Sequence, residues 1–227
     1  MKIGILGTGM VAQTLAAKLS AIGHQVMIGT RDVDKTMERS ETDAYGNPPF
    51  SEWRENHSKV KLENFSDAAA FGEVVINATS GGVSLMALQM AGHDHLKGKI
   101  LIDVANPLDF SEGMPPTLLV CNTDSLGEQI QRVLPDTKVV KTLNTLNAHL
   151  MVDPNKVGKG DHHIFVSGND QAAKDKVVAY LKEWFGWKHI IDLGDITTAR
   201  GTEMLLAIWV RLMGKLGTPM FNFKIVK

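Results

Sequence analysis

The feature that most constrains the fold lies at the start of the chain. A short apolar run, KIGIL at 2–6, leads directly into the glycine-rich segment GTGMVA at 7–12. Residues 10–22 then carry apolar side chains on one helical face, Gly23 follows as a left-handed stop, and QVMIG at 25–29 is a second apolar run. This order predicts a βαβ unit, in which two parallel strands are joined by a right-handed helical crossover.

The same alternation continues along the chain. Strands are predicted at 60–62, 74–79, 99–104 and 138–144, and helices at 66–71, 83–91 and 126–134, the first of these capped by Ser66. Residues 40–59 interrupt the pattern with Gly46, Pro48 and Pro49, which predict a surface excursion with one short helix. Residues 1–146 therefore predict a dinucleotide-binding domain, a doubly wound parallel α/β sheet of the Rossmann type.

Residues 147–227 predict a smaller C-terminal α/β domain for substrate binding or dimerisation. Strands are expected at 163–168 and 189–194, with an amphipathic helix at 170–185 between them. A final helix at about 198–215 carries its few charges in a narrow stripe, so we expect it to be mostly buried, in a core or against a second subunit. We interpret Trp184, Trp187 and Trp209 as core residues rather than ligand-stacking ones.

Composition narrows the classes of function. A formal net charge of −1 produces no overall field that would attract nucleic acid or an anionic membrane. The most apolar stretch, MLLAIWV at 204–210, is too short to cross a bilayer, and the N-terminal residues do not resemble a signal peptide. The only cysteine, Cys121, excludes an internal disulfide, which is typical of a reducing compartment. We therefore expect a cytoplasmic protein with no nucleic-acid or membrane partner.

The glycine segment has the spacing GxGxxA directly after a strand and at the start of a helix, as a dinucleotide fingerprint requires. Gly7 permits the tight turn, Gly9 permits close approach of a pyrophosphate to the helix N-terminus, and Ala12 permits close helix packing. A tight turn without a ligand is the alternative.

The segment GTRDVDK at 29–35 predicts which dinucleotide binds. A chain that binds NAD places Asp or Glu at the end of its second strand to hold the ribose 2′-hydroxyl, and here that position is Thr30. Arg31, Lys35 and the Thr30 hydroxyl can bind a 2′-phosphate, which favours NADP. Asp32 and Asp34 argue against this unless they point outward, and solvated surface charges are the alternative.

Polar residues also follow the later strands, at the edge of the sheet where a nicotinamide would lie. They are Thr79, Ser80, Asn106 and Asn144, with Pro107 as a wall for the ring, although turn chemistry alone also favours Asn and Pro at such positions. His149 is a candidate substrate contact. His162 and His163 point to opposite faces of an extended segment, so we expect structural or solvated roles for them and no metal site.

Taken together, the chain resembles the NADPH-dependent reductases of the deazaflavin coenzyme F420 and their bacterial relatives. The resemblance spans nearly the whole chain and rests on its first 32 residues together with VVKTLNTLNAHLMVDP, DLGDITTARGTEM and LGTPMFNFKIV. It implies NADP bound by Thr8, Gly9, Met10 and Val11 at the pyrophosphate and by Thr30, Arg31 and Lys35 at the 2′-phosphate. It also implies direct hydride transfer between two rings, no required catalytic side chain, and a homodimer.

The excursion at 40–59 and the C-terminal segment are similar to a bacterial subgroup rather than to the archaeal reductases. Many bacteria do not make the deazaflavin, so a flavin, a quinone, a metal chelate or a small carbonyl compound stays open as the second substrate. Related domains in membrane metalloreductases pass electrons from NADPH through flavin. The leading hypothesis is an NADP-dependent oxidoreductase acting on a deazaflavin or flavin-like acceptor. The alternatives are a non-enzymatic NADP-binding redox sensor and a dehydrogenase of the imine or 2-hydroxy acid type, which would continue into an all-helical domain.

Overall fold

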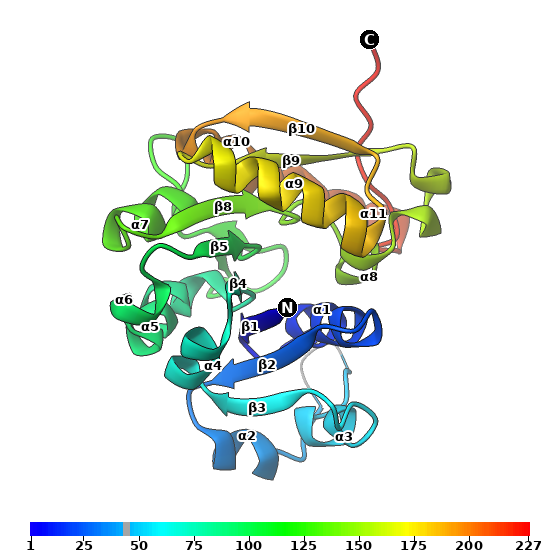
Figure 1. The fold of residues 1–227 in the computed structure, drawn as a ribbon. Coiled ribbons are helices and arrows are strands. Elements are labelled where there is room, and N and C mark those ends of the chain that lie inside the picture. The colour runs from blue at the N-terminus through cyan, green and yellow to red at the C-terminus, as the bar shows by residue number, and fades with distance from the viewer. Residues whose placement is uncertain (43–45) are drawn as a thin grey trace.

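One twisted sheet organises the molecule (Figure 1). The computed structural model describes residues 1–42 and 46–227, and within them eight strands lie in the order β10-β9-β8-β5-β4-β1-β2-β3. Neighbouring strands are parallel except β8 and β9, which pair antiparallel. The strands are β1 (Lys2–Leu6), β2 (Gln25–Thr30), β3 (Lys61–Asn64), β4 (Val74–Asn77), β5 (Ile100–Asp103), β8 (Lys138–Thr142), β9 (His163–Ser167) and β10 (His189–Gly194).

Helices cover both faces of this sheet (Figure 1). One apolar core packs α1 (Met10–Ala21), α8 (Ala148–Val152) and α9 (Gln171–Phe185) against the sheet. The other core lies under α4 (Phe65–Phe71), α5 (Gly81–Ala91), α6 (His93–Leu96), α7 (Leu126–Val133) and α10 (Ala199–Met204). Beside the sheet lie α2 (Val33–Glu38), α3 (Phe50–Glu55) and the two-stranded hairpin of β6 (Leu108–Asp109) and β7 (Thr117–Leu118).

Burial on both faces explains why the central strands β1, β4 and β5 are mostly apolar. In β5, Ile100 and Ile102 belong to the first core, whereas Leu101 between them belongs to the second. Successive side chains of a strand point to opposite faces, so a strand covered on both sides needs apolar residues at every position. Each such side chain contributes roughly 1.5–3 kcal/mol relative to an exposed one.

The predicted doubly wound sheet is confirmed, with differences in detail. The predicted cap of the helix near residue 66 is wrong: α4 begins at Phe65, and Asn64 caps it by accepting a hydrogen bond from the Asp67 N–H at 2.9 Å. The short helix expected in the excursion is α3, while residues 43–45 of that segment lie outside the described residues. Helix α2 and the β6–β7 hairpin were not predicted, because both are too short to show periodicity.

The C-terminal strands extend the same sheet rather than forming another one. Strand β9 pairs with β8 at Lys141 and Thr142, and β10 then pairs with β9. Residues 163–194 thus contain two strands as well as a helix, whereas the dehydrogenase alternative expects an all-helical domain after the first one. A functional division near residue 146 stays a prediction, because the sheet itself runs across it.

The expected terminal helix is two helices, α10 and α11 (Leu206–Leu216), separated at Leu205. Helix α10 is buried through Ala199, Thr202 and Glu203, as expected. Of α11, only Leu206 and Val210 are buried within one chain. The protein's own core therefore does not cover the rest of α11, and burial of this helix against a second subunit stays a prediction.

The aromatic and histidine expectations have mixed outcomes. Trp184 and Trp187 are buried in the first core, as predicted. Trp209 is only half-buried and stacks on Phe221 at a centroid distance of 5.3 Å, so its assignment to the core is wrong. His162 has the expected structural role, since its Nε2 lies 2.9 Å from the Pro154 carbonyl oxygen. None of the helices in the described part of the chain has the length and apolar character to cross a membrane.

Candidate functional site

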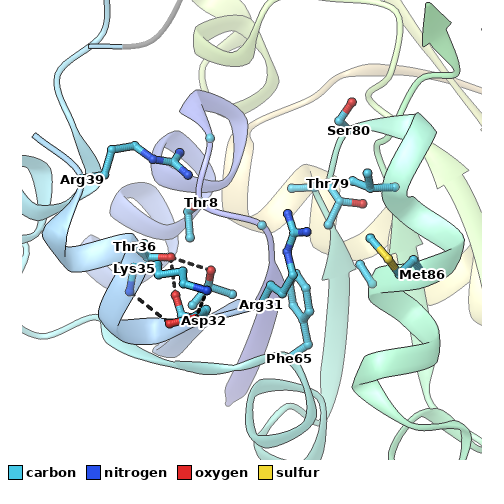
Figure 2. Close-up of a pocket in the computed structure, with 16 residues that line it drawn as sticks. Thr8, Arg31, Asp32, Lys35, Thr36, Arg39, Phe65, Thr79, Ser80 and Met86 are labelled. Carbon is cyan, nitrogen blue, oxygen red and sulfur yellow. Dashed lines mark hydrogen bonds and ion pairs between the residues drawn. The ribbon is translucent and has the colours of Figure 1, made fainter. Parts of the chain in front are cut away.

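A cavity of about 710 Å³ lies where β1, β2 and β4 end (Figure 2). It brings together three segments that are distant in the sequence: the loop after β1, the β2–α2 connection and the β4–α5 turn. The sequence-predicted residues that line it are Gly7, Thr8, Gly9, Thr30, Arg31, Lys35, Thr79 and Ser80. Phe65, Val83, Met86 and Ala87 add an apolar wall.

The glycine loop has the geometry that its motif requires. Gly7 has a φ of +113°, and a Cβ there would lie 2.6 Å from the Ala78 carbonyl oxygen, so only glycine fits. A Cβ at Gly9 would meet no atom within 4 Å, which leaves open space in front of this backbone. No side chain caps α1, so its first N–H groups are free to bind an anion.

Met10 and Val11 stand further from the cavity than the resemblance implied. They are the first residues of α1, and neither lines the main cavity. Met10 instead lines a neighbouring cavity of about 260 Å³, and Val11 packs partly against the first core. Contact with a pyrophosphate through their backbone N–H groups stays a prediction.

Three cationic side chains border the β2–α2 side of the cavity. Arg31 and Lys35 were predicted, and Arg39, just after α2, was not. In Figure 2 the guanidinium groups of Arg31 and Arg39 both extend toward the loop that carries Thr8. Neither arginine forms an ion pair within residues 1–42 and 46–227. Arg39 follows α2 directly and reaches the cavity through the course of this short helix, which the sequence did not predict.

Asp32 does not point away from the site. It lines the cavity, caps α2 by accepting a hydrogen bond from the Lys35 N–H at 3.0 Å, and forms an ion pair with Lys35 Nζ at 3.2 Å. The hydrogen bond from the Lys35 backbone, together with the lysine side chain, lowers the pKa of Asp32. This carboxylate therefore remains ionised, and the Lys35 side chain beside it stays largely exposed to water.

The Thr30 hydroxyl is already used inside the protein. Thr36 Oγ1 donates to the Asp32 carbonyl oxygen at 2.7 Å and lies 2.7 Å from Thr30 Oγ1. Since a hydroxyl has one proton, Thr30 is the donor between the two threonines. Thr30 therefore differs from the expectation of a free phosphate donor and supports the turn that presents Arg31.

Asn106, Pro107 and Asn144 lie outside the cavity walls. Two hydrogen bonds join Asn106 and Asn144. Asn106 Nδ2 donates to the Asn144 backbone carbonyl oxygen at 2.7 Å, and Asn144 Nδ2 donates to Asn106 Oδ1 at 3.0 Å. Pro107 is buried, and its backbone packs against Gly81. These residues join the ends of β5 and β8, and their predicted contact with a nicotinamide stays a prediction. His149, at the start of α8, is exposed.

Sequence reasoning missed a buried ionic cluster next to the cavity. Lys141 Nζ lies 2.8 Å from both Asp103 Oδ2 and Glu203 Oε1, and all three side chains are buried. Burial alone would lower the pKa of Lys141, but the charges of Asp103 and Glu203 outweigh it and raise that pKa. The available signal was a lysine inside the apolar strand VVKTL. No group of three potential metal ligands occurs in the described ranges of the chain.

The arrangement fits a dinucleotide that carries an extra phosphate. The open space at Gly9 and the uncapped α1 suit a pyrophosphate, and the unpaired guanidinium groups suit a second anion near the end of β2. The cavity residues therefore fit NADP better than NAD, for which the end of β2 would need a carboxylate.

Comparisons with known proteins agree with this geometry. Residues 2–107 match the family described as NADP oxidoreductase, coenzyme F420-dependent. The chain is 33% identical to the F420-dependent NADP reductase of Methanocaldococcus jannaschii, over 93% of this chain and 92% of that protein. It is 27% identical to the rat metalloreductase STEAP3 over 96% of this chain but 38% of that protein.

A solved structure is more similar still. A crystal structure of an Arthrobacter sp. FB24 protein, described there as a candidate F420-dependent NADP reductase, superimposes with a TM-score of 0.95. The two chains are 59% identical, and the alignment covers 100% of each. The similarity therefore includes the C-terminal strands and helices as well as the dinucleotide-binding part.

Proposed function

The chain belongs to the family of F420-dependent NADP reductases, and from this premise we propose that it transfers a hydride between NADP(H) and a planar acceptor of the deazaflavin type. The protein is an NADP-dependent oxidoreductase, and its hydride acceptor is a small molecule. The whole-chain agreement with relatives of this name supports the proposal.

The cationic side of the cavity is the observation that carries the choice of cofactor. Arg31, Lys35 and Arg39 border the cavity at the end of β2, and the position of the NAD-specific carboxylate is held by Thr30. A ribose 2′-phosphate can accept charge-assisted hydrogen bonds from the arginine forks. A ribose 2′-hydroxyl offers these arginines no comparable charge, so we propose a preference for NADPH.

The chain's own contribution to the reaction is binding and orientation. The bound nicotinamide supplies the hydride chemistry, and no side chain needs to act as a nucleophile. The glycine loop and the α1 N-terminus hold the pyrophosphate, and the arginines hold the adenosine end. Fixing both ends of an extended cofactor sets the position of the nicotinamide relative to the acceptor.

The identity of the acceptor decides the function within this class. NADPH oxidation is followed at 340 nm with coenzyme F420, FMN and a quinone offered in parallel to the purified protein. We expect turnover with F420. Turnover only with FMN or the quinone would assign the chain to flavin or quinone reduction. Tight NADPH binding without any turnover would favour the redox-sensor alternative.

We also propose that the protein is a cytoplasmic homodimer in which α11 contributes to the interface. Ile208 and Leu216 of this helix are 47% and 55% exposed in a single chain, which is unfavourable for large apolar side chains in water. Analytical ultracentrifugation of wild-type protein should give the mass of two chains. Ile208→Lys should shift that mass toward one chain, and a wild-type monomer would contradict the proposal.

A further inference from the structure

The buried ionic cluster does not end at Lys141 but continues to the wall of the dinucleotide cavity. Asp103 Oδ1 accepts a hydrogen bond from Asn77 Nδ2 at 2.9 Å, while its other oxygen binds Lys141. Asn77 is fully buried at the end of β4, two residues before Thr79. Thr79 lines the cavity, on the wall opposite the segment with Arg31 (Figure 2).

Charge fixes the direction of every hydrogen bond in this chain of residues. Lys141 has only donors, and the Ala105 N–H donates to Asp103 Oδ1 at 3.2 Å, so Asp103 is the acceptor between Lys141 and Asn77. The Asn77 amide must therefore turn its NH₂ group toward Asp103, and its Oδ1 faces the other way. That oxygen accepts both polar hydrogens of Thr79, from the backbone N–H at 3.3 Å and from the hydroxyl at 2.7 Å.

We propose that Lys141, Asp103 and Asn77 are positioning residues for the dinucleotide site: the buried ion pair orients the Asn77 amide, and this amide fixes the Thr79–Ser80 turn on the cavity wall. Ser84 Oγ completes the support, at 2.7 Å from Thr79 Oγ1 and 3.2 Å from Asn77 Nδ2. The turn leads directly into α5, whose residues Val83 and Met86 also line the cavity. The inference rests on the proposed function only in using NADPH as the ligand.

The other end of the chain lies in the C-terminal part of the molecule. Glu203 of α10 binds Lys141 and also accepts the N–H groups of Leu126 at 2.8 Å and Gly127 at 3.0 Å, at the start of α7. The order of the cavity wall therefore depends on a carboxylate supplied by a helix that is distant in the sequence. This gives the buried cluster a role beyond holding the fold together.

A pair of substitutions at Thr79 tests whether the hydroxyl or the methyl group matters. Thr79→Val keeps the shape and removes the donor, whereas Thr79→Ser keeps the donor and removes the methyl group. We expect Thr79→Val to weaken NADPH binding about five- to tenfold, the usual effect of one lost hydrogen bond, and Thr79→Ser to bind within about twofold of wild type. The opposite order would show that packing alone matters and would overturn the inference.

Asn77→Asp gives a readout that a purely structural role would not produce. Asp103 is the titratable group in contact with position 77, with Lys141 and Glu203 behind it. An ionised Asp at position 77 cannot donate to Asp103 and is repelled by it, and this neighbour raises its pKa. Once protonated, it donates as Asn does, so NADPH affinity relative to wild type should be about tenfold low at alkaline pH and should recover on acidification.

The matched control is Asn64→Asp. Asn64 also ends a strand and donates to a carboxylate, Asp67 Oδ2, at 2.6 Å, but it is exposed and does not line the cavity. Dissociation constants are measured by NADPH fluorescence across pH, each divided by the wild-type value at that pH. Recovery for Asn77→Asp but not for Asn64→Asp supports the inference, and a pH-independent ratio overturns it.

The Thr79 pair decides the matter if Asn77→Asp does not fold. Wild-type protein that binds no NADPH at all would instead overturn the proposed function, and the inference with it.

Discussion

Two lysine–aspartate pairs have opposite properties: one lines the cavity, and the other is buried behind its wall and linked to Thr79 through Asn77. Lys35 and Asp32 lie 3.2 Å apart with side chains 81% and 39% exposed, whereas Lys141 and Asp103 lie 2.8 Å apart with both side chains 0% exposed. Water screens the first pair, so its charges can separate and rearrange around a ligand. No water can reach the second pair and take the place of either partner, so its two side chains stay together.

This difference assigns the two pairs to different tasks. A mobile cation beside Arg31 and Arg39 suits the capture of a phosphate. A fixed pair suits the orientation of a neighbouring amide, here that of Asn77. The same two residue types therefore serve binding where they are exposed and positioning where they are buried.

The largest expected effect comes from breaking the buried pair. Lys141→Met leaves Asp103 and Glu203 as two buried carboxylates without a counter-ion, which should lower the free energy of unfolding by about 3–5 kcal/mol. Urea denaturation measures this. Lys35→Met is the matched control and should leave the denaturation midpoint unchanged. Equal midpoints for both variants would show that burial does not separate the two pairs.

The next effect concerns ligand binding without loss of stability. Arg31→Ala should weaken NADPH binding roughly tenfold to a hundredfold, as expected for lost charge-assisted hydrogen bonds, and should change NADH binding much less. Arg132→Ala is the control, because Arg132 is also exposed but is paired with Asp124 on α7's side of the molecule. Titration calorimetry with both nucleotides gives the comparison. Equal losses for NADPH and NADH would place Arg31 away from the 2′-phosphate.

A smaller effect is expected at Lys35, which acts as a screened point charge. Lys35→Met should weaken NADPH binding about two- to fivefold at low salt, and the difference from wild type should shrink at high salt. Fluorescence titrations at two ionic strengths measure it. A loss that does not depend on salt would indicate a direct, desolvated contact instead.

The smallest effect is a gain. Asp32→Asn keeps the helix cap, since Asn caps as well as Asp does, and removes a negative charge from the cavity wall. NADPH should bind about twofold tighter while the melting temperature stays within error. Weaker binding would mean that Asp32 holds Lys35 in its binding position and that the cap alone does not explain this carboxylate.

Features set by residues close together in the sequence were predictable, and features set by residues far apart in the sequence were not. The βαβ unit and the residues Gly7, Gly9, Arg31 and Lys35 were predictable, because the turn, the helix start and the strand end are set by neighbouring residues. Lys141 was not, because its partner Asp103 is 38 positions away and meets it only through the pairing of β5 with β8. The antiparallel β9 and the break between α10 and α11 likewise depend on tertiary packing.

The preference for NADPH is tested by the ratio of the dissociation constants of NADH and NADPH for the wild-type protein. We expect NADPH to bind at least about tenfold tighter, through the cations at the end of β2. Equal constants, or tighter binding of NADH, would contradict it, because the exposed cluster would then be an ordinary solvated surface.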